Sequence, residues 1–535
     1  MTRTARTYPG DRGERYVLSV DLGSSVVKVG LVSLDGTIAW WSRTALETIR
    51  AADGAVTQDP ERWWQIILQE AQRALAEGPV DRTQLVAVAV TGQWSSTVPV
   101  DATGHPVGPA LMWADTRGER HARELLSGRV QGYRARVAFE WVRRSGGIPT
   151  PSGGDSLGNL LFLERDAPDV AAATAYYLEP VDYLTMRFTG VTTATHASMF
   201  PSWLTDNRHL EVLDYDPVLV ALAGLDRGKL PPLLVTGSVV GPIAASVAEE
   251  LAIDPGILVV NGLPDLHASA VGSGCVADHE AHLAVSTTTW VSCPVPKKKT
   301  DLFRSVASVP GLWPGQYLVV NNQRASGRCL EWLRDQVVAP LDGLVAAEPP
   351  TYERLVALAG TVSAGSGGVI FTPWLDGENS PVEDPYARAG FHNLSLHTTR
   401  AHLVRSVLEG VAYNARWLLE AADNFTGRRL DPVRLVGGGI QSDLWCQIIA
   451  DVTGRTAERV ADPVLCGLRG AALFAGLVLG AVGREELRDL VPVDAIFTPD
   501  AANRRMYDRI YDEYLRMYKV QRGAFGRLNK HPIWK

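Results

Sequence analysis

Two aspartates, Asp21 and Asp265, each lie at the end of an apolar run that has the composition of a buried β-strand. Asp21 is followed by Leu-Gly-Ser24-Ser25, in which the glycine lets the backbone approach a phosphate and the serines add hydroxyl and N–H donors. Asp21 itself suits Mg²⁺, which binds through water and one or two carboxylates. The same residues also suit a simple hairpin turn, and the pattern alone does not decide between the two interpretations.

Asp265 ends the segment Gly262-Leu-Pro-Asp265, just past the carboxyl end of a predicted strand at residues 257–260. Open α/β sheets place their chemistry at this end of their strands. A carboxylate there can serve as the base that takes the proton from an acceptor hydroxyl in phosphoryl transfer. Taken by itself, however, the position fits a helix cap better than a catalytic base.

A triplet of glycines, residues 437–439, separates another predicted strand from a helix that begins near Ser442 and Asp443. Because no side chains intervene, a ribose or a phosphate can approach the N–H groups at the start of this helix. The triplet has the spacing of neither the dinucleotide fingerprint GxGxxG nor the Walker A loop. No Ser/His/Asp order or HExxH occurs, and the 11 histidines lack metal-ligand spacing, so a hydrolase or a zinc enzyme is disfavoured.

The elements that must position these residues follow an α/β pattern that begins twice. Predicted strands at residues 16–21 and 26–32 flank the first serine turn, and a helix at 60–77 and a strand at 85–91 follow. A second start near residue 250 brings a strand at 256–262 and two more around the turn Ser286 to Thr289. The similar strand–turn–strand units predict a duplicated domain that clamps a ligand between its copies, with each turn as an anion-binding nest.

Helices dominate the rest of the predicted C-terminal half, at residues 399–425 and 443–453. The apolar stretch Gly470 to Gly483 is 14 residues long, too short to span a bilayer, and is expected to be a buried core helix. Residues 504–518 have tyrosines at helical spacing, which predicts an amphipathic helix that docks them on the core.

The overall composition is that of an ordinary globular protein, with 535 residues, of which 46% are hydrophobic and 21% charged. A net charge of −7 disfavours a protein that binds nucleic acid by neutralising phosphates. The five cysteines lack CxxC spacing, and the first fifteen residues lack the apolar core of a signal peptide. We therefore expect a cytoplasmic protein with neither nucleic acid nor membrane as a partner, and the sequence leaves a homodimer open.

In their order along the chain, these and further motifs resemble those of the FGGY carbohydrate kinases, which phosphorylate sugars and polyols. The resemblance extends from about Tyr16 to Tyr518 and rests on these segments: Asp21-Leu-Gly-Ser-Ser-Val-Val-Lys28, Gly92-Gln93, Trp113-Ala-Asp115-Thr-Arg117, Leu178-Glu-Pro-Val-Asp182-Tyr, Gly262-Leu-Pro-Asp265, Pro373-Trp-Leu-Asp-Gly-Glu378-Asn-Ser-Pro381, Leu408-Glu-Gly-Val411, Gly437-Gly-Gly-Ile-Gln-Ser442 and Trp445-Cys-Gln-Ile-Ile-Ala-Asp451. It implies an α/β fold of two actin-like (ribonuclease H-like) ATPase domains with an interdomain cleft. The domains would be residues 16–250 and 251–535, after a flexible segment at 1–15.

The resemblance also implies roles for individual residues in phosphoryl transfer from ATP to a sugar or polyol. Asp265 matches the general base, and Asp21 and Asp265 together would flank Mg²⁺. The residues that match the nucleotide site are Ser24, Ser25, Lys28, Thr287, Gly327, Gly438, Gly439 and Asp443. Those that match the substrate site are Gln93, Trp94, Ser95, Asp115, Arg117 and again Asp265. Closure of the two domains on ATP and sugar would exclude water, the competing acceptor.

The departures from the family pattern lie mostly around the sugar. Xylulokinases, the nearest members overall, carry Gln-Met-His-Gly where this chain has Gln93-Trp-Ser95-Ser96, and glycerol kinases carry Arg-Glu there. Leu266 replaces a residue that is commonly Asn or Gln, so we expect an acceptor other than simply xylulose. The second turn, Ser286 to Thr289, lacks the family's flanking glycines, which predicts weakened or rearranged phosphate binding because positive φ angles become costly.

Two other functions are left open by the sequence. A sugar-sensing pseudokinase would account for the altered sugar site and the glycine-poor turn, although Asp21 and Asp265 are both present. An actin-like ATPase with a protein partner would share the fold, but the segment that ends at Arg117 and the C-terminal motifs favour a carbohydrate kinase.

Overall fold

The computed structural model describes residues 12–130, 133–340, 342 and 348–530. Most of the expected flexible segment, residues 1–11, therefore lies outside the described residues, while Arg12–Glu14 forms a short 3₁₀ turn, η1.

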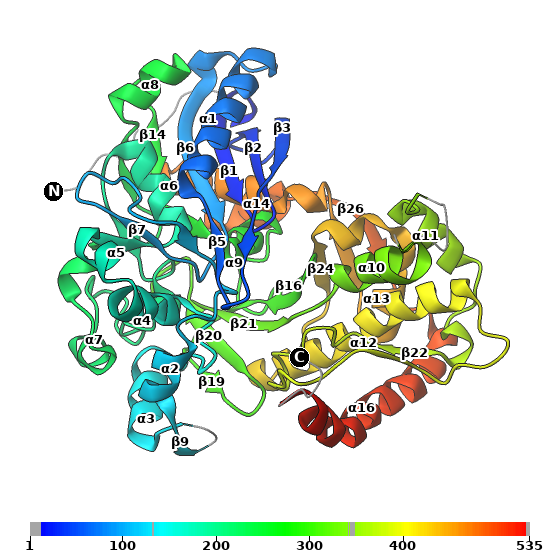
Figure 1. The fold of residues 1–535 in the computed structure, drawn as a ribbon. Coiled ribbons are helices and arrows are strands. Elements are labelled where there is room, and N and C mark those ends of the chain that lie inside the picture. The colour runs from blue at the N-terminus through cyan, green and yellow to red at the C-terminus, as the bar shows by residue number, and fades with distance from the viewer. Residues whose placement is uncertain (1–11, 131–132, 341, 343–347, 531–535) are drawn as a thin grey trace.

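Two mixed β-sheets form the centre of the two halves of the molecule, with helices packed around them (Figure 1). The first sheet has the order β13 (Val239–Pro242), β14 (Leu258–Val260), β6 (Leu85–Gly92), β1 (Tyr16–Leu22), β2 (Val26–Ser33), β3 (Ile38–Ala45). The second has the order β19 (Thr300–Asp301), β20 (Val306–Pro310), β21 (Tyr317–Gln323), β17 (Thr289–Ser292), β16 (Ala281–Val285), β24 (Val433–Val436), β25 (Ala457–Val460), β26 (Val493–Phe497).

The two sheets share one topology. In the first, β1 pairs antiparallel with β2 and parallel with β6, which in turn pairs parallel with β14. In the second, β16 pairs antiparallel with β17 and parallel with β24, which pairs parallel with β25. The next strands, β3 and β21, both add antiparallel to the hairpin. The duplicated strand–turn–strand units predicted from the sequence therefore correspond to equivalent positions in two equivalent sheets.

The change from one sheet to the other comes later in the chain than expected. The strand predicted at residues 256–262, taken as the start of the second repeat, is β14, and it pairs with β6 of the first sheet. The short strand β15 (Leu263–Pro264) also pairs with β6. A parallel strand returns to its sheet after a long crossover, so its apolar sequence alone does not reveal which sheet it joins. The boundary expected at residue 250 thus falls within the first sheet.

Several helices have the bounds that the sequence indicates. α1 (Pro60–Glu77) begins after Asp59, whose carboxylate accepts from the N–H of Glu61, and α13 (Asp443–Thr453) begins after Ser442. α12 (Arg400–Thr426) is the long central helix of the second half. α16 (Ala501–Asn529) buries four tyrosines of its inner face, Tyr507, Tyr511, Tyr514 and Tyr518, which confirms the predicted docking on the core.

The remaining helices are α2 (Glu119–Leu126), α3 (Ala135–Arg144), α4 (Ser156–Asp166), α5 (Pro168–Ala173), α6 (Pro180–Thr189), α7 (Pro217–Ala223), α8 (Ala245–Leu251), α9 (Asp265–Gly272), α10 (Gly327–Leu333), α11 (Tyr352–Gly360), α14 (Cys466–Val478) and α15 (Leu487–Leu490). The strands outside the two sheet paths are β4 (Ile49–Arg50), β5 (Val56–Gln58), β7 (Val98–Val100), β8 (Ala110–Leu111), β9 (Ser127–Val130), β10 (Tyr176–Leu178), β11 (Ala194–Thr195), β12 (Leu233–Leu234), β18 (Pro294–Val295), β22 (Ile370–Thr372) and β23 (Gly390–His392).

Two helices, α9 and α14, cross in direct backbone contact and connect the halves. A Cβ atom added at Gly272 would lie 2.0 Å from the carbonyl oxygen of Cys466, and one at Gly470 would lie 1.9 Å from that of Ala268. Only glycine fits at such a crossing. α14 also packs on β1 and β6, so a helix from the C-terminal half covers the first sheet. The predicted core helix at 470–483 is this element, which begins four residues earlier and ends at Val478.

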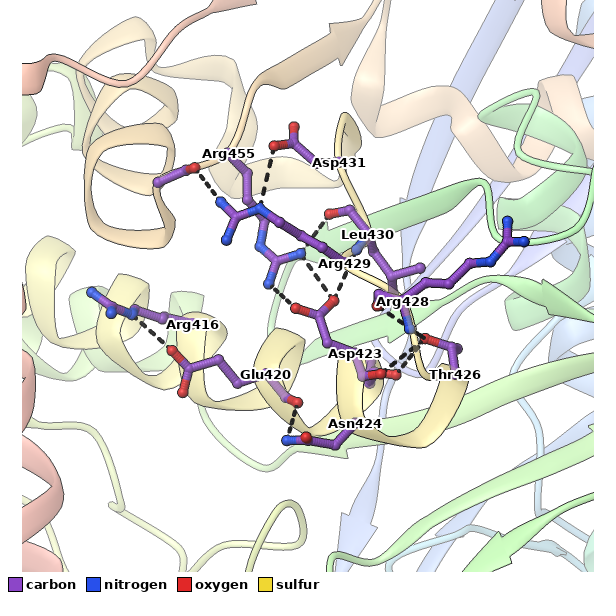
Figure 2. Close-up of polar contacts among 12 residues, drawn as sticks. Arg416, Glu420, Asp423, Asn424, Thr426, Arg428, Arg429, Leu430, Asp431 and Arg455 are labelled. Atoms are coloured by element: carbon purple, nitrogen blue, oxygen red, sulfur yellow. Dashed lines mark hydrogen bonds and ion pairs between the residues drawn. The ribbon is translucent and has the colours of Figure 1, made fainter.

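The C-terminal end of α12 is fixed by ion pairs, which Figure 2 shows. The buried guanidinium of Arg455, at the end of α13, bonds the carboxylate of Asp423 at 2.6 Å and the carbonyl oxygen of Leu430 at 2.5 Å. One turn earlier, Arg416 pairs with Glu420 at 3.0 Å. The contacts of Arg455 hold the connection from α12 to β24, the strand that leads to the glycine triplet.

The five cysteines all lie in the described part of the chain, where they are buried and free. Across the same residues, no helix combines the length and the apolar character needed to traverse a bilayer.

Candidate active site

Asp21 and Asp265 lie at the same edge of the first sheet. Thr91 of β6 pairs with Asp21 of β1 on one side and with Leu263 of β15 on the other. Since β1, β6 and β15 are parallel, their carboxyl ends meet at this edge, and Asp265 follows directly as the first residue of α9. On the neighbouring strand β2, the ammonium group of Lys28 lies 2.8 Å from Oδ2 of Asp21.

The carboxylate of Asp265 has an environment suited to a base. Burial raises its pKa to about 7, and the nearby charge of Asp21 acts in the same direction. The N–H of Leu266, 2.7 Å from Oδ1, and the charge of Lys28 act against this shift. A base with a pKa near neutrality accepts a proton efficiently at physiological pH. The side chain bonds the N–H of the next residue, and the N-cap position of α9 is held by Pro264, so helix capping does not explain Asp265.

The two carboxylates fit a magnesium ion that arrives with phosphates. Asp21 raises the pKa of Asp265, so a nearby dication would relieve the repulsion between them. Among the described residues no group of three His, Cys, Asp or Glu side chains could form a complete protein cage. Mg²⁺ commonly takes only one or two carboxylates, with phosphates and water as its other ligands. Gly467 of α14 leaves room beside Asp21, because a Cβ there would lie 2.7 Å from Oδ2.

The first serine turn connects β1 to β2 and is held by its backbone. The carbonyl oxygens of Ser24 and Ser25 accept hydrogen bonds from Gln58 Nε2 at 2.7 Å and from the N–H of Leu46 at 2.9 Å. Ser24 is partly exposed and Ser25 is exposed. The turn therefore lies fixed at the sheet edge with accessible serines, beside Asp21.

The second turn, between β16 and β17, is held by the start of α10. The N–H of Gly327 donates to the carbonyl oxygen of Ser286 at 2.8 Å, and that of Ser326 donates to Thr287 at 3.1 Å. Thr287 itself is exposed. None of the four described residues from Ser286 to Thr289 has a positive φ. The conformation that would have required glycine is thus not used, which removes the reason for expecting weak phosphate binding here.

The glycine triplet lies against the end of β16. Gly437 has a φ of 102°, and a Cβ there would lie 2.5 Å from the carbonyl oxygen of Val285. Gly439 packs on the side chain of the same valine, whereas Gly438 has open space around its Cα. The triplet and the second turn therefore adjoin at one edge of the second sheet. Asp443 instead directs its largely exposed carboxylate to Arg459, at 2.6 Å.

Residues 93–96, which we name the acceptor loop after their predicted role, follow β6 at the same edge as Asp265. Gln93 is buried, and neither its Nε2 nor its Oε1 has a hydrogen-bond partner in the described chain. The indole N–H of Trp94 donates to the carbonyl oxygen of Ser198 at 2.8 Å, and its ring lies 5.7 Å from that of His267 on α9. Ser95 has a φ of 64°. An unsatisfied amide and a left-handed serine in one loop are typical of a functional site.

Asp115 and Arg117 form an internal support. Asp115 is buried and accepts from the N–H of Val56 at 3.0 Å and from Arg117 Nη2 at 2.7 Å. The guanidinium of Arg117 lies 4.3 Å over the ring of Phe162. The pair fixes the segment of Trp113, whose N–H donates to Ser96 Oγ at 3.1 Å. Direct contact of Asp115 or Arg117 with substrate stays a prediction.

Three residues near the acceptor loop were not among the predicted site residues, although two of them, Trp113 and Glu179, stand in segments that carry the family resemblance. Trp113 leaves 41% of its surface exposed, and its backbone N–H donates to Ser96 of the loop. His267 is buried, bonds the carbonyl oxygen of Pro310 at 2.8 Å, and has a pKa lowered to about 4 by burial. The buried carboxylate of Glu179 accepts a hydrogen bond from the N–H of Ser96 in the loop. A lone His carries no distinctive spacing, so only the fold reveals His267, and only the fold places Trp113 and Glu179 beside the loop.

Comparison with known proteins bears on the whole chain. The N-terminal domain of the FGGY family of carbohydrate kinases matches residues 16–272, and its C-terminal domain matches residues 283–479. A xylulose kinase of Staphylococcus epidermidis is 24% identical over 510 residues, which cover 95% of this chain and 97% of that protein. A glycerol kinase of Chloroflexus aggregans is 28% identical over 511 residues, covering 92% and 97%.

Solved structures agree with this comparison. The xylulose kinase from Rhodospirillum rubrum superimposes with a TM-score of 0.81 at 27% identity, over 96% of this chain and 100% of that one. The ligand-bound xylulose kinase from Lactobacillus acidophilus has the same fold, with a TM-score of 0.83 at 20% identity and the same coverage. The predicted fold of two actin-like ATPase domains is confirmed. The chain belongs to the FGGY family of carbohydrate kinases, and it is similar to the xylulose kinases among them.

Proposed function

We propose that the protein transfers the terminal phosphoryl group of ATP to a hydroxyl of a sugar or polyol, with Asp265 as the general base. The observation that carries this proposal is the position of a carboxylate with a pKa raised to about 7, beside Asp21, at the edge where the acceptor loop begins. The base removes the proton of the acceptor hydroxyl as its oxygen attacks phosphorus, and ADP leaves.

The nucleotide would lie between the two serine and threonine turns. Ser24, Ser25 and Thr287 offer hydroxyl and N–H donors to the phosphates, and Lys28 adds positive charge beside Asp21. Gly438, with open space at its Cβ position, leaves the backbone accessible to the adenosine half, while Gly327 and Gly439 allow the backbone to pack closely on the second turn and on Val285. Asp21 and Asp265 would hold Mg²⁺, which supplies charge neutralisation for the phosphates. Asp443 is the least supported member of this set, because it is engaged with Arg459.

The acceptor would meet Gln93, Trp94 and Ser95. A hydroxyl-rich ligand satisfies the buried amide of Gln93, whose atoms otherwise lack partners in the described chain. The indole of Trp94 offers an apolar ring to the carbon face of the acceptor, and Leu266 adds to the same apolar cluster. This combination supports a small polyhydroxylated acceptor that contacts a polar side chain on one side of the pocket and apolar side chains on the other.

A panel assay tests the proposal directly. Purified protein with ATP and Mg²⁺ is screened against pentuloses, hexuloses, tetritols and pentitols, with coupled detection of ADP. We expect acceptor-dependent ADP formation that Asp265→Asn lowers by about 10²- to 10⁴-fold, the usual contribution of a general base. Asp254→Asn is the matched control, since this exposed aspartate caps a nearby turn and should leave turnover unchanged. Near-normal turnover in Asp265→Asn would show that another group is the base.

A further inference from the structure

Ser95 holds a conformation that its own sequence does not favour. Its φ of 64° lies in the left-handed region, which costs free energy for any residue with a side chain. Such a conformation persists only where the surroundings hold it. The residues on either side, Trp94 and Ser96, are both anchored by hydrogen bonds, the former through Ser198 and the latter through Trp113. Within the acceptor loop, the backbone strain therefore lies at Ser95.

Glu179 contacts this loop from inside the protein. Only 2% of the residue is exposed, and its Oε2 accepts a hydrogen bond from the N–H of Ser96 at 3.2 Å. Its Oε1 accepts from the hydroxyl of Ser156, the first residue of α4. Glu179 is itself the residue before α6, so one carboxylate connects the acceptor loop to the ends of two helices.

No cation among the described residues pairs with this carboxylate. Within the described chain, neither Glu179 nor the buried Asp182 one turn later forms a salt bridge, and one oxygen of Asp182 has no hydrogen-bond partner. Burial raises the pKa of Glu179 well above its usual value, while the hydroxyl of Ser156 and the N–H groups of the loop oppose this shift. A buried carboxyl group without a cation is costly, so its hydrogen bonds to the loop account for its position.

We propose that Glu179 is the positioning residue of the acceptor loop. By holding the N–H of Ser96 it keeps Ser95 in the left-handed conformation, and thereby sets where Gln93 and Trp94 meet the acceptor. The unsatisfied amide of Gln93 in the same loop is the independent sign that the loop binds a ligand. This inference rests on the proposed kinase function, because its acceptor is the substrate of that reaction.

The kinetic test separates positioning from general support. Glu179→Leu keeps the approximate volume but removes both acceptors, and we expect the KM for the best acceptor to rise at least tenfold while the KM for ATP stays within twofold. Glu179→Gln retains an oxygen for Ser96 and an amide that donates to Ser156, so it should restore the acceptor KM to within threefold of wild type. Glu164→Gln is the control, because this carboxylate of α4 pairs with Lys229 away from the loop. An unchanged acceptor KM in Glu179→Leu, or an equal rise for ATP, would overturn the proposal.

A second measurement does not depend on turnover. Hydrogen exchange of the amides of Ser95 and Ser96 should be at least tenfold faster in Glu179→Leu than in wild type, with no ligand present. If Glu179→Leu does not fold, Ser156→Ala loosens the carboxylate while leaving it in place, and exchange at Ser96 should still rise. Unchanged exchange would refute the positioning role even if the protein proves active. Faster exchange in a protein that phosphorylates no acceptor would retain the role and reject the proposed function instead.

Discussion

The raised pKa of Asp265 should be measurable as a loss of folding stability with rising pH. The ordinary pKa of an aspartate in the unfolded chain is 3.8, whereas that of Asp265 in the folded protein is about 7. The folded state therefore binds this proton more tightly than the unfolded state does. The stabilisation that the proton gives is fully present below pH 3.8, and it is lost as the pH rises through about 7. Asparagine carries no such proton, so Asp265→Asn should gain stability relative to wild type as the pH rises.

The size of this effect follows from the two pKa values. A difference between 3.8 and about 7 corresponds to about 4 kcal/mol over the whole range, and to about 3 kcal/mol between pH 5 and pH 8. The free energy of unfolding of Asp265→Asn minus that of wild type should therefore be about 3 kcal/mol larger at pH 8 than at pH 5. Urea unfolding of the ligand-free protein at both pH values measures it, with Asp254→Asn as the reference, whose exposed carboxylate should give no such pH dependence.

The comparison uses the difference between two pH values because a two-domain protein need not unfold in a single step. Any change that the asparagine makes in packing or in unfolding mechanism appears equally at both pH values and cancels. A stability difference between Asp265→Asn and wild type that is the same at pH 5 and pH 8 would refute the pKa argument. The base assignment would then lose its electrostatic support, whatever the activity of the variant.

Four further outcomes are expected. Trp94→Ala should raise the acceptor KM several-fold and leave the KM for ATP unchanged, whereas an unchanged acceptor KM would remove the indole from the pocket. Gly327→Ala should raise the KM for ATP, because the new Cβ would lie 2.6 Å from a carbonyl oxygen of the second turn; Gly241→Ala, with open space around it, is the control. Lys28→Met removes a charge that lowers the pKa of Asp265, so the acid limb of the pH–rate profile should move to higher pH, and a shift to lower pH would contradict this. Chelation of Mg²⁺ should abolish turnover but leave measurable nucleotide binding by calorimetry, and full loss of both would place the metal in the binding step.

Local patterns were sufficient to predict the elements that a short stretch of sequence specifies. The helix at 60–77 begins after Asp59 and ends before Gly78, and the helix at 443–453 begins after Ser442 and ends before Gly454, so both have clear chemical start and stop signals. The hairpin of β1 and β2 is equally local. The strand β14 was misassigned because its partner β6 lies more than 150 residues earlier in the chain, and apolar composition does not specify a partner.

At the candidate site, the sequence did not predict the backbone states. The glycine-poor second turn was expected to suffer from lost φ freedom, yet the turn uses none, while Ser95 of the acceptor loop adopts the left-handed conformation. Backbone φ follows from tertiary contacts such as that of Glu179 with Ser96, which have no sequence signature. The pairing of Asp115 with Arg117 was likewise not foreseen, because the same two residue types suit a ligand equally well.

The duplicated sheets contribute unequal chemistry, and this inequality is the reason for expecting that nucleotide binding and metal binding can be separated. At the end of β1 the chain has Asp21, and the same edge adds Asp265, so the first half carries the negative charge of the site. At the equivalent end of β16 it has Val285 and uncharged hydroxyl and glycine residues. Phosphates are attracted to N–H donors but repelled by carboxylates unless a cation intervenes. Under the proposed function, we therefore expect a nucleotide to bind the second half without a metal, whereas its terminal phosphate would approach Asp21 and Asp265 only with the charge of Mg²⁺ between them.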